Sequence, residues 1–175
     1  VLVHANGEKQ QATLSELAEL DRLYPESLPM QQNIAEPEWA AFCQWRNSLT
    51  PLLERLIAPV LPAYDEISHD EEDMNFYRNE CERRFQQSVE ALANDRYGAY
   101  QQLESRGRLR ELGKILARQR FYTGDLSLVD IILTADLHLL RLLDGVTIPL
   151  DLQYYFQRVA DACNISLNDG MTQSL

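Results

Sequence analysis

The sequence predicts a mainly α-helical protein, and three features of the chain lead to this prediction. Apolar residues recur at spacings of three and four through most of residues 37–167, which is the period of one helix face. Several of these stretches begin at a residue that can cap a helix, and proline or glycine separates them. Strand signals are confined to the N-terminal residues, so we expect little sheet.

The N-terminal segment predicts a hairpin followed by a short helix. Val1–Val3 and Lys9–Gln11 would pair across Asn6-Gly7, which suits the positive φ angles of a tight turn. Thr13 begins a capping box for a helix that Pro25 ends. A hairpin with one helix is only marginally stable in water, so this unit should need further strands that these residues do not contain.

The first long helix is expected from Pro37, because proline suits the first turn of a helix. Thr50-Pro51 should kink this helix or split it in two, and Pro59 and Pro62 should end it. The apolar stripe along it comprises Phe42, Trp45, Leu49, Leu52, Leu53, Leu56, Ile57 and Val60.

Two further helical stretches follow. Asp70 is expected to cap the first, and Gly107 should break or bend the second. The apolar residues of the first stretch are Met74, Tyr77, Cys81, Phe85, Val89 and Leu92, and those of the second are Tyr100, Leu103, Leu109, Leu112 and Leu116. A last helix is expected over 151–163, with Tyr154, Tyr155 and Val159.

The start of the helix expected from Leu128 to Leu143 is the most informative part of the sequence. After a turn at Gly124, the Ser127 side chain can accept a hydrogen bond from an amide of the first turn, while Asp130 reaches back to the amide of Ser127. Eleven of the sixteen residues in this helix are apolar, which predicts a buried helix. Because the paired bonds account for both polar groups, we interpret Ser127 and Asp130 as structural.

Charge and cysteine content restrict the function classes. The net charge is −11 and the isoelectric point about 4.7, which argues against nucleic-acid or anionic-membrane binding because phosphate contacts require cations. Cys43, Cys81 and Cys163 form no disulfide framework, Cys-x-x-Cys pair or zinc knuckle, so we expect unreactive thiols and no metal. No apolar stretch reaches the length of a membrane span, and we expect a cytoplasmic protein.

Some charged residues have both a functional and a structural interpretation. Asp136 should pair with a cation of a neighbouring helix or face a cleft, whereas His138 fits the polar side of its helix. A basic segment can mark a surface for a protein partner, although an ordinary solvated helix face is the favoured interpretation. Its members are Arg106, Arg108, Arg110, Lys114, Arg118 and Arg120, six of the sixteen basic residues of the chain.

These features together resemble the glutathione-transferase fold, in which a thioredoxin-like half precedes an all-helical half. The sharpest motif is Gly124-Asp125-x-Ser127-Leu128-x-Asp130. Within this fold the chain is most similar to the type-two glutaredoxins, through Leu56-Ile57-Ala58-Pro59, the helical residues 71–119 and Gly145-Val146-Thr147-Ile148-Pro149. A second resemblance is to the stringent starvation protein A family, through residues 121–130 and Leu20-Asp21-Arg22-Leu23-Tyr24-Pro25.

The resemblance implies a thioredoxin-like remnant at 1–28, a linker at 29–36 and a helical transferase-type domain at 37–167. The tail at 168–175 is polar, and we expect it to be loose. Type-two glutaredoxins are glutathione-dependent thiol-disulfide oxidoreductases that react through a Cys-x-x-Cys pair, which these residues lack. We therefore expect the reacting cysteines to precede Val1, with glutathione as co-substrate and protein disulfides as partners.

Two further functions remain as alternatives. One is a non-catalytic interaction protein of the starvation-protein type, and the other is a conjugating glutathione transferase. Transferases hold glutathione with a Glu/Gln-Ser pair where this chain has Ala12-Thr13, so Thr13 is the candidate glutathione contact, although its own capping bond is a simpler use. Proteins of this fold often dimerise, but the sequence alone identifies no self-complementary surface.

Overall fold

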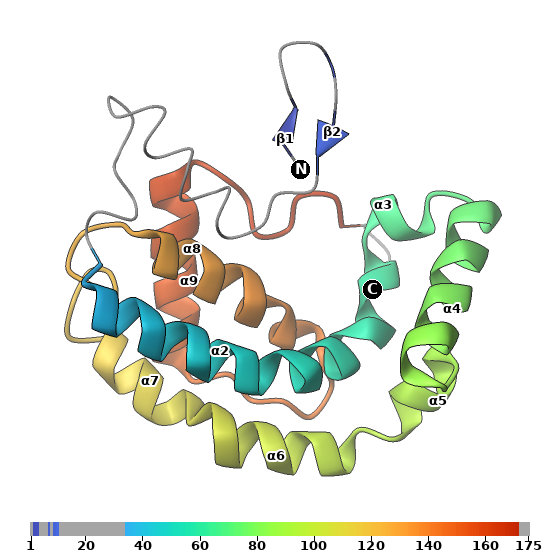
Figure 1. Cartoon of the computed structure of the whole chain (residues 1–175), viewed down its shortest axis with the longest axis horizontal. Coiled ribbons are helices and arrows are strands. Elements are labelled where there is room, and N and C mark those ends of the chain that lie inside the picture. The colour runs from blue at the N-terminus through green and yellow to red at the C-terminus, as the bar shows by residue number, and fades with distance from the viewer. Residues whose placement is uncertain (1, 4–6, 8, 11–33, 172–175) are drawn as a thin grey trace.

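A computed structural model describes residues 2–3, 7, 9–10 and 34–171 (Figure 1). From residue 34 onward the described chain is helical, which confirms the mainly α prediction. The α-helices are α2 (Glu36–Ile57), α3 (Asp65–Ser68), α4 (Glu71–Phe85), α5 (Val89–Asn94), α6 (Tyr97–Gly107), α7 (Leu109–Leu116), α8 (Leu128–Leu137) and α9 (Leu150–Cys163), and the 3₁₀ helices are η1 (Ala58–Ala63) and η2 (His138–Leu142).

The N-terminal hairpin is present as two very short strands. Strands β1 (Leu2–Val3) and β2 (Lys9–Gln10) pair antiparallel, with Val3 opposite Lys9. Between them Gly7 has a φ of +82°, in the left-handed region that glycine adopts without steric cost. The turn therefore uses the glycine as the sequence predicts.

The helices pack around α2, which crosses the middle of the molecule (Figure 1). α2 packs against α6 and α8, and α9 packs against both α7 and α8. Gly113 brings α7 close to α9, because a Cβ atom there would lie only 3.4 Å from the side chain of Leu152. α4 and α5 lie at the far end of α2, on the right of Figure 1.

The buried side chains of residues 34–171 form two separate cores. The main core lies between α2, α6, α7, α8 and α9 and includes Leu49, Leu152 and Tyr155, each with no exposed surface. A second, small core lies beneath α4 and α5. It consists of Ala58, Cys81, Val89 and Leu92, with Tyr77 and Phe85 packed against it. The lobe formed by α4 and α5 therefore has its own apolar support.

α2 runs through Pro51 as one helix, so the expected division into two does not occur. Pro51 has no amide hydrogen to donate, but buried leucines on both sides of it hold the helix against the main core. Thr50 Oγ1 donates a hydrogen bond of 2.9 Å to the carbonyl of Arg46. The α-helix ends at Ile57, and the expected prolines follow within the 3₁₀ helix η1.

The two helical stretches in the middle of the sequence are each divided. Asp70 caps α4 as expected, by accepting a hydrogen bond of 2.9 Å from the amide of Asp73. The stretch that the sequence treats as one helix ends at Gln86, a left-handed residue with a φ of +55°, and Ser88 caps α5. The break between α6 and α7 is at Arg108, directly after the glycine at which it was expected.

The helix expected to reach Leu143 changes form part-way. α8 ends at Leu137, and the 3₁₀ helix η2 continues the chain. Leu137, Leu140 and Leu143 are all buried, at a spacing of three residues. A 3₁₀ helix, with three residues per turn, keeps such residues on one line, whereas an α-helix would rotate them away from the core.

Residues 168–171, the first part of the tail that the sequence predicts to be loose, are attached to the helical body. Met171 forms an isolated antiparallel bridge with Tyr64, and the amide of Asp65 donates a 2.8 Å hydrogen bond to the carbonyl of Gly170. Backbone pairing therefore anchors residues that carry few apolar side chains. Residues 172–175 lie outside the described part.

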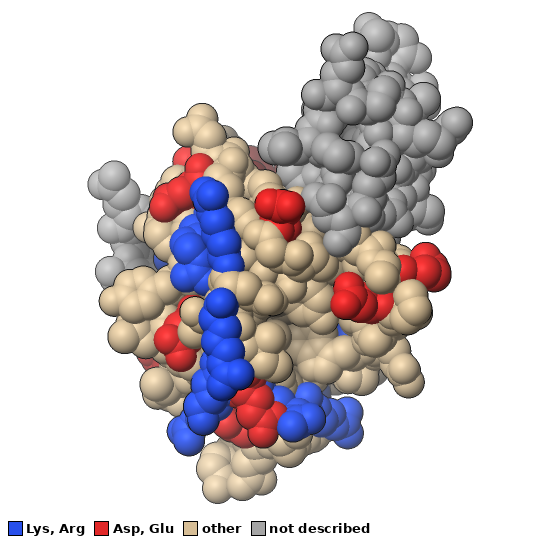
Figure 2. All heavy atoms as spheres, turned by 90° about the vertical axis from the view of Figure 1, so that its left-hand side faces the viewer, with Lys and Arg blue, Asp and Glu red and all other residues tan. Residues whose placement is uncertain are grey.

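The six members of the basic segment are all exposed, on α6, on α7, at the break between these helices and in the turn that follows α7. Figure 2, which views the molecule from the left of Figure 1, shows lysine and arginine side chains gathered in a column on this face. Arg108 forms an ion pair with Glu111 three residues later. No described helix is long and apolar enough to cross a membrane.

Candidate functional site

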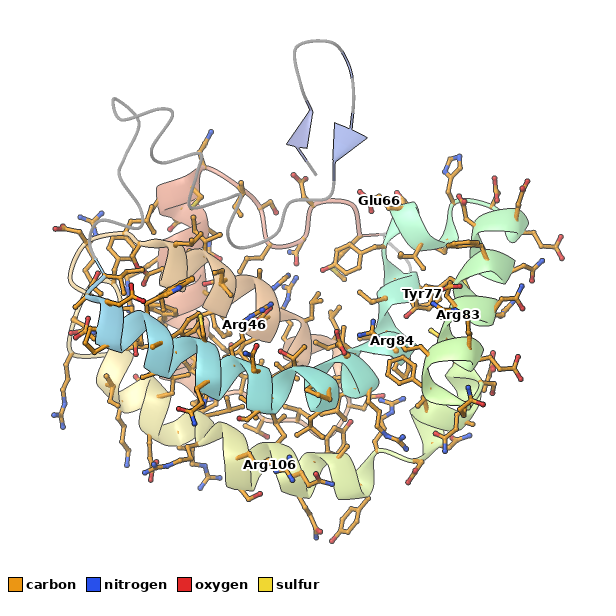
Figure 3. All side chains as sticks on the ribbon, viewed as in Figure 1. Arg46, Glu66, Tyr77, Arg83, Arg84 and Arg106 are labelled. Carbon is orange, nitrogen blue, oxygen red and sulfur yellow. The ribbon has the colours of Figure 1, made fainter. Side chains whose placement is uncertain are left out.

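A cavity of about 330 Å³ lies between the α4 lobe and the rest of the helical body. Its base is apolar and is formed by side chains of α2, η1 and η2, namely Leu53, Ile57, Ala58, Leu61 and Leu139. Tyr77, labelled in Figure 3, lies on the α4 side, and Cys81 and Phe85 follow it at intervals of about one helical turn. The cavity is large enough for a small apolar group.

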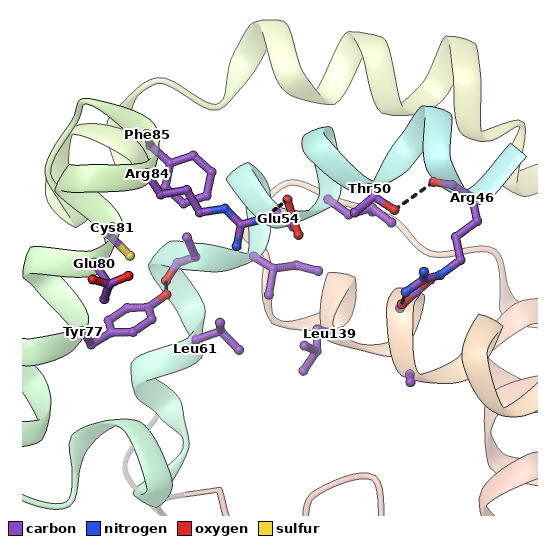
Figure 4. Close-up of a pocket in the computed structure, with 15 residues that line it drawn as sticks. Arg46, Thr50, Glu54, Leu61, Tyr77, Glu80, Cys81, Arg84, Phe85 and Leu139 are labelled. Atoms are coloured by element: carbon purple, nitrogen blue, oxygen red, sulfur yellow. Dashed lines mark hydrogen bonds and ion pairs between the residues drawn. The ribbon is translucent and has the colours of Figure 1, made fainter. Parts of the chain in front are cut away.

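An ion pair joins two helices at one end of this cavity (Figure 4). Arg46 on α2 donates hydrogen bonds to both carboxylate oxygens of Asp136 on α8. Nε lies 2.5 Å from Oδ2, and Nη2 lies 3.0 Å from Oδ1. About a quarter of each side chain is exposed. The hydrogen bond to Asp136 raises the pKa of Arg46 above its ordinary value. The predicted pairing of Asp136 with a cation of another helix is confirmed, and the pair also lines the cavity.

A second ion pair links α4 to α2 across the same cavity. Arg84 Nη2 lies 2.5 Å from Glu54 Oε2, and its guanidinium group is 5.5 Å from the ring centre of Phe85. Glu80, also in the lining, binds Arg83 on the outer side of α4. The cations and carboxylates of the rim are thus largely matched, so the rim favours a ligand of little net charge.

The groups inside the cavity are suited to packing rather than to reaction. Cys81 is only 4% exposed and belongs to the small core. The hydroxyl of Tyr77 donates a hydrogen bond of 2.7 Å to the carbonyl of Ala58. Burial raises the pKa of Tyr77 far above its ordinary value, and the neighbouring Cys81 thiol adds to this effect. The Tyr77 hydroxyl therefore keeps its proton near neutral pH.

The capping box at the start of α8 is present, and its carboxylate is part of a larger network. Asp130 has no exposed surface and accepts hydrogen bonds from the amide of Ser127 at 2.8 Å, the Ser127 hydroxyl at 2.5 Å and the amide of Tyr122 at 2.7 Å. The hydroxyl of Tyr155 on α9 donates a fourth bond, at 2.6 Å. Four donors use the acceptor capacity of a carboxylate, which leaves this group a structural role.

Among the described residues, the others that the sequence singles out do not join a reactive cluster. Thr13, the candidate glutathione contact, lies outside the described residues. Cys43 and Cys163 are half-buried. Burial is the larger cause that raises the pKa of Cys163, and the charge of Asp130 is the smaller one. His138 bonds the carbonyl of Thr134 through Nδ1 at 2.9 Å. Across the described part of the chain, three or more metal-ligating side chains do not gather at one place.

Apart from Asp136, sequence reasoning did not identify the polar residues that line the cavity. Arg46, Thr50 and Glu54 follow one another at four-residue spacing beside the apolar stripe of α2, and this line of polar residues is a signal that the sequence contains. Tyr77 and Arg84 could not be placed in the same way, because only the fold brings α4 opposite α2.

Comparison with known proteins gives one match. The family model described as "Glutaredoxin 2, C terminal domain" matches residues 41–172. The chain belongs to this family. The match covers α2 from its second turn to the bridge at Met171, and with the helical architecture it establishes a helical domain of the glutathione-transferase C-terminal type. No curated protein and no solved structure shows significant similarity to the chain.

Within this glutaredoxin 2 C-terminal domain, the Arg46–Asp136 pair should couple α2 to α8. We expect a double-mutant cycle with Arg46→Ala and Asp136→Ala to give a coupling energy of about 1 kcal/mol, because the pair is bidentate but partly exposed. Denaturant unfolding of the two single variants and the double variant measures it. The exposed pair Arg83–Glu80 serves as the control and should show much weaker coupling; equal coupling for the two pairs would contradict this expectation.

His138 should contribute to the pH dependence of stability. Burial, with the charge of Arg141 as a smaller cause, lowers the pKa of His138 below 6.5. Below that pH the unfolded chain therefore binds more protons than the folded one, and stability falls as the pH decreases. We expect His138→Gln to reduce the loss of unfolding free energy between pH 7 and pH 5. His69→Gln, at an exposed position, should leave the wild-type loss unchanged.

Proposed function

We propose that this chain is the helical part of a glutaredoxin-type, glutathione-dependent thiol-disulfide oxidoreductase, whose reacting Cys-x-x-Cys pair lies outside these 175 residues. The family match over residues 41–172 carries the proposal. The state of the chain's own thiols supports it, because Cys81 is packed in a core and the pKa of Cys163 is raised. A thiol of this kind is a poor nucleophile for disulfide exchange.

The proposed reaction is an exchange between thiols and disulfides. A thiolate of the catalytic half attacks the glutathione sulfur of a protein–glutathione mixed disulfide, and the protein leaves as its thiolate. The thiolate of a second glutathione then attacks the enzyme–glutathione disulfide. This step regenerates the enzyme thiolate and releases glutathione disulfide, so one glutathione is oxidised for each mixed disulfide reduced.

The cavity between α2 and α4 is the part of this chain that we assign to the substrate. Its apolar base, which includes Leu53 and Ile57, would receive the apolar portion of the substrate next to the mixed disulfide. The ion pairs of Arg46 and Arg84 hold the walls at a fixed separation. Thr13 is the proposed contact to glutathione itself, so Thr13→Val should raise the KM for glutathione whereas Thr13→Ser should retain the wild-type value.

The test compares this chain alone with the same chain joined to a catalytic half that contains Cys-x-x-Cys. We expect no glutathione-dependent reduction of a mixed disulfide by the chain alone and clear turnover by the joined protein. In the joined protein, Ala135→Trp should raise KM for a protein mixed disulfide about tenfold by filling the cavity. Ala40→Trp, on an exposed turn of α2, is the control. Turnover by the chain alone would refute the proposal.

The interaction protein remains the second candidate, because the exposed basic segment offers a surface that the oxidoreductase does not require. The coding sequence upstream of Val1 separates the two. A Cys-Pro-x-Cys segment there supports the oxidoreductase, and a complete gene without it favours the interaction protein. The conjugating transferase, third, would require measurable transfer of glutathione to an electrophile by the protein with its N-terminal half.

A further inference from the structure

A groove runs between α2 and α7, on the side of the molecule opposite the α4 lobe. It consists of two adjoining hollows that share Trp45 and Leu112, with volumes of about 180 Å³ and 460 Å³. The smaller hollow is lined by three aromatic rings, in which Phe42 lies 6.1 Å from Trp45 and 6.3 Å from Tyr122 between ring centres. Such a hollow suits an aromatic or large aliphatic side chain.

The rim of this groove is basic. Arg108 and Lys114 line the larger hollow, together with Ile115, of which 56% is exposed, and with Glu111, the ion-pair partner of Arg108. The remaining members of the basic segment, Arg106, Arg110, Arg118 and Arg120, are close to these residues in the sequence, and all are exposed. Among the described residues, Arg108 alone of this segment forms an ion pair. The groove therefore combines an apolar interior with cations that a partner's carboxylates can reach.

A surface with the complementary properties lies on the α4 lobe of the same chain. Six exposed carboxylates gather at α3 and the start of α4, namely Asp65, Glu66, Asp70, Glu71, Glu72 and Asp73. Phe76, 70% exposed, follows Glu72 and Asp73 at four and three residues and shares their helix face. The α4 lobe and α7 lie at different ends of the molecule in Figure 1, so one copy cannot bring the two surfaces together.

We propose that α4 of one copy docks into the α2–α7 groove of a second copy. Phe76 enters the aromatic hollow, and the carboxylates of α4 face Arg108, Lys114 and their basic neighbours. An amphipathic helix lying in an apolar groove is a common recognition mode, and the opposed charges select this pair of surfaces. Elsewhere the copies repel each other, because the chain carries a net charge of −11.

The contact joins two different surfaces, so it is a head-to-tail contact. In a pair of copies, one copy keeps an unoccupied groove and the other keeps an unbound α4. This geometry permits a decisive test with two variants. Phe76→Ala removes the inserted side chain but keeps the groove intact. Lys114→Glu reverses a charge of the groove but keeps α4 intact. Each variant alone should associate much more weakly than the unmodified chain, and a mixture of the two should form a one-to-one pair that grows no further.

Sedimentation equilibrium of the whole chain at concentrations up to about 0.5 mM measures the association. For the unmodified chain the average mass should rise with concentration and fall with added salt, because the charges are exposed. Each variant should raise the dissociation constant at least about tenfold. Tyr97→Ala, which removes an exposed aromatic residue of α6, is the control and should associate as the unmodified chain does.

Three outcomes would overturn the proposal. The chain could remain monomeric throughout the concentration range, which would leave the groove for a foreign acidic partner. Phe76→Ala could associate as strongly as the unmodified chain. The mixture of the two variants could fail to pair although both variants show the wild-type circular dichroism spectrum and melting temperature, which excludes misfolding as the cause.

Discussion

Replacing Asp130 with alanine is expected to lower the free energy of unfolding by about 4 kcal/mol, because it leaves buried donors without an acceptor. The carboxylate has no exposed surface, and four hydrogen bonds of 2.5 to 2.8 Å end on it. Two of the donors are amides, of Tyr122 and Ser127, which position the turn before α8. The hydroxyl of Tyr155 ties α9 to the same group.

Chemical denaturation at pH 7 measures this loss of unfolding free energy. Two related variants show how much of it comes from individual hydrogen bonds. Tyr155→Phe removes only the bond from α9 and should cost about 1.5 kcal/mol. Ser127→Ala removes the hydroxyl but keeps the amide donor, and should cost about 1 kcal/mol. A loss for Asp130→Ala no larger than that for Tyr155→Phe would mean that water or another side chain satisfies the remaining donors.

The same network shows which interactions a sequence can and cannot predict. The capping box joins residues three apart, so the motif alone predicts the contact between Ser127 and Asp130. Tyr155 lies twenty-five residues further along the chain, and its bond to Asp130 depends on how α9 packs against α8. The sequence likewise predicts that Asp136 needs a cation. That this cation is Arg46, ninety residues away, depends on how α2 packs against α8.

Helix ends differ in how clearly the sequence marks them. Asp70 and Ser127 begin helices with side-chain caps, and both are predicted. The break at Arg108 follows Gly107, which marks it in the sequence, whereas the break at Gln86 is a left-handed residue with a side chain and no neighbouring glycine or proline. The polar residues on the α2 side of the cavity follow a four-residue spacing that the sequence shows. The residues on the α4 side face the cavity only because the chain turns back after α3, which no local pattern predicts.

The division of the apolar interior into two cores leads to the second large effect. Leu92→Ala should destabilise the α4 lobe by about 3 kcal/mol while the main core stays folded. Leu92 is 1% exposed and belongs to the small core with Ala58, Cys81 and Val89, which is separate from the cluster around α8 and α9. The loss should therefore appear as local opening rather than as a uniform decrease in stability.

Native-state hydrogen exchange distinguishes local from global opening. For Leu92→Ala, amide protection should decrease in α4 and α5 and remain at the wild-type level in α8 and α9. Leu152→Ala, a truncation of equal size in the main core, should decrease protection in every helix. Uniform loss with Leu92→Ala would show that the two cores unfold as one. Because α4 forms one wall of the proposed substrate cavity, local opening should also weaken substrate binding before it affects the overall fold.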